Sequence, residues 1–171
     1  MKKSLLLLFS IILTGCLGMP ENVQPVENFD VQQYMGKWYE VARLDHSFER
    51  GLSEVTAEYS IQNNGKVTVI NRGYSASESE WKQAEGKAYF VNTSDQGYLK
   101  VSFFGPFYGS YVVFELGENY QYAFVSGPDN DYLWLLSRTP EIDEGIKEKF
   151  TSMSNARGFD TKNLIWVSHN Q

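Results

Sequence analysis

Cys16 is the residue of this 171-residue chain whose type and position point most directly to chemistry. It is the only cysteine, and it follows Leu13, Thr14 and Gly15. Small residues before a cleavage point let the backbone enter a peptidase groove, and a cysteine at that point offers a thiol that can receive a diacylglyceryl group. Because there is no second cysteine, an internal disulfide is impossible, so packing and hydrogen bonds must hold the fold.

The residues before Cys16 have the order of an export signal. Lys2 and Lys3 are followed by an apolar run over residues 5–13, broken only by Ser10. The run is too short to span a bilayer, which takes about 20 residues, but it has the length of a signal-peptide core. The pattern resembles the lipobox of bacterial lipoproteins. That resemblance implies a signal peptide over residues 1–15 and several acyl chains on the new N-terminus, which anchor stably where one chain does not.

Sorting follows from the next residue. Lipoproteins retained in the inner membrane usually carry Asp after the cysteine, and this chain carries Leu17. The resemblance therefore implies anchoring to the outer membrane, with the folded domain in the periplasm. The alternative is an ordinary secretory signal in which Cys16 falls by chance.

Other chemistry-bearing patterns are sparse. The two histidines are far apart in sequence, no metal-ligand spacing occurs and there is no Gly-x-Ser-x-Gly turn. We therefore expect no catalytic residue, no metal and no cofactor, with an enzyme as the alternative class. Without Lys2 and Lys3 the formal charge falls from −6 to about −8, which argues against a nucleic-acid partner. Aromatic residues make up 15% of the chain, which fits either a cavity with aromatic walls or a solid aromatic core.

The elements expected to position these residues are short strands. Residues 16–28 contain two prolines and no periodicity, which predicts a lipidated tether ahead of a domain over residues 29–171. Turn signals such as Asn63-Asn64-Gly65 separate eight candidate strands, which predict an antiparallel sandwich or closed barrel. The expected strands are 36–44, 53–61, 66–72, 83–91, 98–104, 111–116, 120–126 and 131–137.

One helix is expected after the strands. Thr139 and Pro140 suit its start, Gly158 suits its end, and an apolar stripe lies between them. A helix with one apolar face must cover a surface, which we expect to be the outside of the barrel near Tyr39 and Val41. Residues 164–167 are expected to add a ninth, edge strand. The stripe consists of Ile142, Ile146, Phe150 and Met153.

Four sequence features together resemble the lipocalin family. The first strand opens with Gly36-Lys37-Trp38-Tyr39, residues 29–35 fit a short helix that plugs one barrel end, and Glu118-Asn119-Tyr120 partly matches the second family signature. Ser137-Arg138 closes the eighth strand. With the stretches 103–109 and 131–134, the chain looks most similar to bacterial lipocalin lipoproteins and their apolipoprotein D-like relatives.

The resemblance implies an all-β fold, an eight-stranded antiparallel up-and-down barrel with one C-terminal helix packed outside. It also implies that the Arg138 guanidinium lies over the Trp38 ring at the closed end, with Gly36 and Tyr120 as further structural residues. We expect Glu40 to be the ionic partner of Arg138, because a buried charge needs one.

An eight-stranded barrel is wide enough for one small ligand, and the resemblance implies a hydrophobic one. A fatty acid or lysophospholipid, carried or stored at the outer membrane, is the expected partner. We expect the first loop, residues 46–51, to lie beside the mouth with its charges facing solvent. The aromatic loop at 104–111 could instead form a partner or homodimer surface, which leaves an interaction protein as a further alternative. Alternation and the family together give the expected ligand-binding residues Val55, Ala57, Tyr59, Val69, Val101, Phe103, Tyr108, Tyr132 and Trp134.

Overall fold

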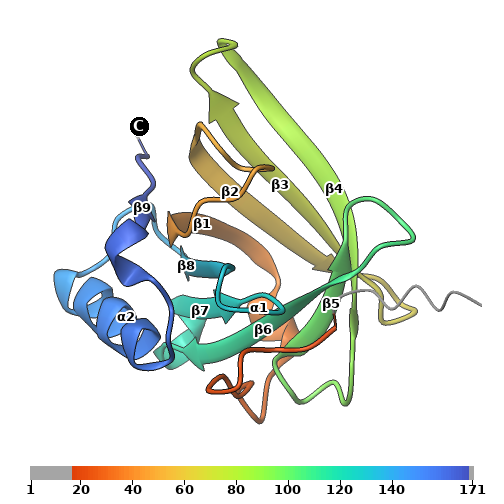
Figure 1. Ribbon diagram of the computed structural model, residues 1–171. Coiled ribbons are helices and arrows are strands. Elements are labelled where there is room, and N and C mark those ends of the chain that lie inside the picture. The colour runs from red at the N-terminus through yellow and green to blue at the C-terminus, as the bar shows by residue number, and fades with distance from the viewer. Residues whose placement is uncertain (1–16, 170–171) are drawn as a thin grey trace, which may run out of the picture.

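A closed antiparallel barrel forms the body of the protein (Figure 1). The structure is a computed structural model, and it describes residues 17–169. Each strand pairs with the next along the chain, and β1 pairs with both β2 and β8, so the sheet closes on itself. This confirms the expected up-and-down barrel. The strands are β1 (Gly36–Arg43), β2 (Leu52–Ile61), β3 (Val67–Ser75), β4 (Glu80–Phe90), β5 (Tyr98–Ser102), β6 (Gly109–Leu116), β7 (Tyr122–Ser126) and β8 (Leu133–Ser137).

Alternating side chains separate an inner from an outer face, because successive residues of a strand point to opposite sides. In β5, Leu99 and Val101 face the interior cluster while Lys100 faces outward. In β8, Trp134 and Leu136 face inward, whereas Leu133 and Leu135 belong to a second apolar cluster outside the barrel. The chain therefore buries two separate cores, one inside the barrel and one between barrel and helix.

Strand β1 breaks this alternation. Its pairing with β8 shifts by one residue between Glu40 and Ala42, which marks a β-bulge. As a result Glu40 and Arg43, three residues apart, meet in a buried ion pair at 2.6 Å. Val41 and Ala42 instead join the outer cluster. The bulge explains why neither face of β1 reads as apolar in the sequence.

The barrel seam between β1 and β2 is short. Only residues 36–39 of β1 pair with β2, at one end of the barrel. Further along, the two strands separate and β9 (Ile165–Trp166) pairs with Ala42 and Arg43 instead. The backbone N–H of Glu54 on β2 also donates to the carbonyl of Ser168. The expected ninth strand is thus confirmed, and it bridges the part of the seam that β1 and β2 leave open.

Helix α2 (Glu144–Ala156) lies on the outside of the barrel (Figure 1). Its side chain Phe150 is fully buried against an outer cluster that includes Val41 and Phe124, but not Tyr39. The expected start at Thr139 is wrong, because Asp143 caps the helix by accepting a hydrogen bond from the Gly145 N–H. Among residues 17–169, no helix is both long and apolar enough to cross a bilayer.

A cation-π contact closes one end of the barrel. The Arg138 guanidinium lies 3.8 Å from the centre of the Trp38 ring, as expected. It also donates to three backbone carbonyls, those of Gln33, Lys37 and Tyr120. Helix α1 (Val31–Tyr34) plugs this end, and the Trp38 indole N–H donates to the Tyr34 carbonyl at 2.8 Å. We call this the closed end.

The open end follows from the up-and-down topology. The connections β1–β2, β3–β4, β5–β6 and β7–β8 all lie at the end opposite α1. We call these four connections at the open end the rim. The remaining connections between consecutive strands of the barrel lie at the closed end.

The segment before α1 is not a free tether. Val23 is fully buried in the outer cluster, and the Val26 N–H donates to the Val113 carbonyl. At its start, the Gly18 N–H donates to Ser110 Oγ at 2.9 Å. The expectation of a flexible tether over 16–28 is therefore wrong from Gly18 onward, because long-range pairing with the barrel, invisible in local sequence, fixes the segment.

We predict that Arg138→Ala lowers the free energy of unfolding by about 2–4 kcal/mol, because it removes a cation-π contact and three charge-assisted hydrogen bonds. Urea unfolding followed by tryptophan fluorescence measures the change. The matched control is Arg50→Ala, which removes an exposed ion pair with Asp45 and should cost no more than about 0.5 kcal/mol. Equal effects of the two substitutions would contradict a structural role for the Arg138 contact.

Candidate functional site: the barrel interior

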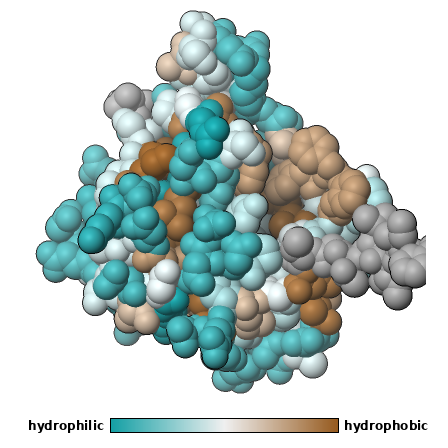
Figure 2. Space-filling model, viewed as in Figure 1, coloured by the Kyte–Doolittle hydropathy of each residue, from teal (hydrophilic) through white to brown (hydrophobic). Residues whose placement is uncertain are grey.

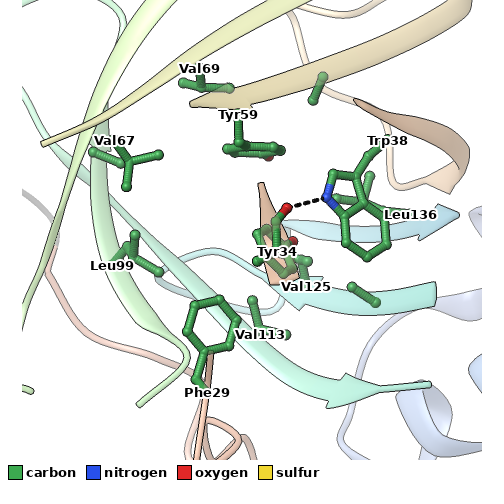
Figure 3. Packing of buried hydrophobic residues seen from close by; sticks show 13 residues of the cluster. Phe29, Tyr34, Trp38, Tyr59, Val67, Val69, Leu99, Val113, Val125 and Leu136 are labelled. Atoms are coloured by element: carbon green, nitrogen blue, oxygen red, sulfur yellow. Dashed lines mark hydrogen bonds between the residues drawn. The ribbon is translucent and has the colours of Figure 1, made fainter. Parts of the chain in front are cut away.

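The lower part of the interior is lined by apolar and aromatic side chains near the closed end. Figure 3 shows Phe29, Tyr34 and Trp38 near Val113, Val125 and Leu136, with Tyr59, Val67, Val69 and Leu99 around them. The Tyr34 ring packs on Trp38, with ring centres 4.8 Å apart. Of the expected ligand-binding residues, Ala57, Tyr59 and Val69 lie in this buried cluster. Val55 is also buried, on the same face of β2.

Higher in the barrel, the inward side chains are less completely buried. Val101, Phe103, Tyr111 and Trp134 pack against the interior cluster but keep solvent-accessible surface. An inward-pointing apolar side chain that remains accessible must border space that solvent can reach. The structure therefore places three expected residues, Val101, Phe103 and Trp134, where a ligand could contact them.

Three tyrosine hydroxyls form a chain inside the barrel. The Tyr111 hydroxyl lies 2.6 Å from that of Tyr34 and 2.9 Å from that of Tyr59. Burial raises the pKa of each of these hydroxyls, so all three are neutral at ordinary pH. Three hydroxyl hydrogens serve two mutual hydrogen bonds, so one O–H is left to donate to another acceptor.

A buried acidic pair and one arginine lie between β1 and the first loop. Arg43 binds Glu40 and donates to the backbone carbonyls of Glu49 and Leu52. Burial and the neighbouring Glu49 raise the pKa of Glu40 well above its usual range, and burial also raises the pKa of Glu49. Arg43 supplies the positive charge that a buried carboxylate needs as a partner.

This cluster corrects two expectations. Glu40 pairs with Arg43, not with Arg138, because the β-bulge turns both side chains inward. The charges of the first loop do not all face solvent, because Glu49 is buried and accepts a hydrogen bond from the Trp134 indole at 3.0 Å. The sequence signal that could have found the cluster is the pair of opposite charges, Glu40 and Arg43, that flanks the apolar residues Val41 and Ala42.

The rim holds an aromatic stack. The His46 ring lies between Phe48 and Tyr132, with ring centres 5.2 and 4.8 Å away and nearly parallel planes. The expected residue Tyr132 therefore lies at the rim, near the mouth. Burial, with help from the Arg43 charge, lowers the pKa of His46 to about 4.

Tyr108 does not line the interior. Its ring lies 5.4 Å from Lys100 Nζ and 5.8 Å from Lys87 Nζ. Both lysines alternate with inward residues of β4 and β5, so they project outward. The expectation that Tyr108 contacts ligand is corrected, because the β5–β6 loop folds it over the outer face.

We predict that His46 makes the barrel less stable as pH falls from about 6.5 to about 4. The unfolded histidine takes up a proton near its ordinary pKa of about 6.5, whereas the folded one resists until about 4, so stability is present above this window and lost within it. The loss should be on the order of 2 kcal/mol. His46→Phe keeps the stacking but cannot take up a proton. Its free energy of unfolding should therefore fall less between pH 6.5 and pH 4, as measured by urea titrations at several pH values. Identical pH dependence in the two proteins would contradict the assignment.

Comparisons with known proteins agree with this geometry. Residues 29–169 match the model of the lipocalin-like domain family. The chain is 68% identical to Outer membrane lipoprotein Blc of Vibrio cholerae over 98% of both chains. It is 51% identical to Outer membrane lipoprotein Blc of Escherichia coli, over 93% of this chain and 90% of the other. Apolipoprotein D of Mus musculus is 30% identical over 81% of this chain and 76% of its own length.

The fold is also similar to solved structures. Insecticyanin from the tobacco hornworm Manduca sexta superposes with a TM-score of 0.73 at 21% identity, covering 90% of this chain and 88% of that one. Lobster apocrustacyanin A1 superposes with a TM-score of 0.66 at 18% identity, covering 89% and 93% of the two chains. With the closed eight-stranded barrel, the Trp38–Arg138 contact and the family match over residues 29–169, the chain belongs to the lipocalin family.

Proposed function

We propose that this lipocalin binds a fatty acid or a lysophospholipid in its barrel and carries or stores it at the outer membrane. The observation that carries the proposal is the inward apolar surface at mid-barrel, where Val101, Phe103 and Trp134 remain partly accessible. An acyl chain lying there would gain about 0.8 kcal/mol for each methylene it buries. Polar groups are few in the interior and mostly paired with one another, which favours a ligand whose buried part is a hydrocarbon chain.

The place of action follows from the named relatives and from the lipobox-like pattern that ends at Cys16. The relatives at 68% and 51% identity are named outer membrane lipoproteins. This chain is likewise a lipid-anchored lipoprotein of the outer membrane, with Cys16 as the acylated residue. Cys16 itself lies outside the described residues. A protein that binds a lipid without chemical change leaves it intact, so we expect a lysophospholipid incubated with the protein to be recovered unchanged.

We predict that Val101→Trp lowers the affinity for a fluorescent fatty acid by about tenfold or more, because the larger inward indole occupies part of the interior that the proposal assigns to the acyl chain. Displacement titration of the fluorescent fatty acid measures the loss. Circular dichroism establishes that the barrel is still folded. The matched control is Lys100→Trp, which puts the same indole on the outward face of β5 and should change affinity by no more than about twofold.

Mass spectrometry of the gently extracted protein supplies the complementary test. A fatty acid or lysophospholipid should be recovered with the native protein and in reduced amount with Val101→Trp. Protein that carries no lipid and takes up no fluorescent fatty acid contradicts the proposed function. Conversion of lysophospholipid to free fatty acid would replace the carrier by an enzyme.

A further inference from the structure

We propose that the open end of the barrel rests on the bilayer surface, so that the mouth faces the membrane to which the chain is anchored. The inference rests on the proposed lipid anchor at Cys16. It goes beyond that anchor because a lipoprotein on a free tether could take any orientation. Three features of the chain support this orientation.

The first feature is where the described chain begins. The Gly18 N–H donates to Ser110 Oγ, near the start of β6, and the Gly18 carbonyl accepts a hydrogen bond from the Tyr98 hydroxyl at 3.5 Å. The Gly18 backbone also lies beside the Pro128 carbonyl in the β7–β8 connection. Ser110 and Pro128 adjoin or belong to rim connections, whereas Tyr98 begins β5 on the closed-end side, and its hydroxyl extends to within 3.4 Å of Ser110 Oγ. The N-terminal segment therefore starts at the open end and runs along the outside of the barrel to the closed end.

The second feature is the short covalent distance to the anchor. Cys16 precedes Gly18 by two residues, so its Cα stays within about 8 Å of the Gly18 Cα. Along β6, beside which the segment lies, six residues separate Ser110 from Leu116 at the closed end, which is about 20 Å, so the anchor lies nearer to the rim than to the closed end. Burial of Val23 and the hydrogen bonds of Gly18 and Val26 to the barrel remove the slack that a tether would have supplied.

The third feature is the distribution of exposed apolar side chains. Phe104 and Phe107 in the β5–β6 connection are 77% and 62% exposed, and Phe48 in the β1–β2 connection is 57% exposed. Figure 2 shows hydrophobic surface gathered on the right of the view, where Figure 1 places the β5–β6 connection. Among residues 17–169, none of the large exposed apolar side chains lies in a closed-end connection.

The occupant of this surface is a lipid bilayer. Residues 103–108 carry no charged side chain, and the nearby Leu17, the residue after Cys16, is also half exposed. The rings of Phe104 and Phe107 and the acyl chains on Cys16 start from the same end of the barrel. Both can therefore enter the apolar layer of one bilayer, as interfacial anchors do. The rim acids, among them Asp129 and Asp131, gain nothing from an anionic surface, so apolar contact and the acyl chains must hold the mouth down. A ligand could then pass between bilayer and barrel without crossing water.

The test uses the mature acylated protein in vesicles of phosphatidylethanolamine and phosphatidylglycerol. Because the Cys16 thiol is acylated, an introduced cysteine is the only free thiol. Phe107→Cys at the rim and Asn64→Cys in the β2–β3 connection at the closed end each carry an environment-sensitive fluorophore. Nitroxide-labelled lipids should quench the rim probe about threefold more than the closed-end probe, and its emission should shift to shorter wavelength.

Vesicle flotation separates the two levels of the proposal. Protein that fails to float with vesicles overturns the lipid anchor and the orientation together. Protein that floats, with both probes equally exposed to water or with the closed-end probe quenched more, overturns the orientation alone and leaves ligand binding in place. Near-ultraviolet circular dichroism of each labelled protein establishes that the barrel is native.

Discussion

Closure of the sheet between β1 and β2 is the constraint on which the rest of the molecule depends. The seam consists of residues 36–39 alone, which is a short ladder for joining the two edges of a barrel. Arg138, which directly follows β8, reinforces it by covering the Trp38 ring and donating to the carbonyls of Gln33 in α1, Lys37 in β1 and Tyr120 in the β6–β7 connection. Gly36 makes room at this point, since its φ of +92° suits glycine and a Cβ there would face the Arg138 guanidinium. Above the seam, the C-terminal segment fills the gap that β1 and β2 leave.

The closed sheet creates an interior in which polar groups must pair with one another. The tyrosine hydroxyls do so near the floor, and Glu40, Arg43 and Glu49 do so below the first loop. The Glu49 contact with Trp134 also holds that loop over the barrel. The cluster therefore links the shape of the mouth to the wall of the interior.

The sequence predicts the strands and their inner faces well, because alternation is a local property that survives in the fold. It also predicts the Trp38–Arg138 contact, although that prediction came from a family resemblance and not from spacing. The start of α2 is a local miss, since Asp143 and not Thr139 caps the helix, but the other misses depend on how segments pack in three dimensions. The bulge in β1 brings Glu40 to Arg43, and pairing of Val26 with Val113 and Gly97 turns an apparent tether into part of the domain. The prediction for Tyr108 is wrong because the path of the β5–β6 loop, and not strand alternation, decides whether its side chain faces the interior or the outer surface.

The proposed function requires a barrel that is hollow and apolar enough to hold an acyl chain. A crystal structure with a fatty acid that carries bromine on its tail, located by anomalous scattering, tests this requirement. We expect a bromine peak inside the barrel, within contact distance of Val101, Phe103 or Trp134. A peak found only on the outer surface, or an interior filled by side chains at full ligand concentration, would contradict it.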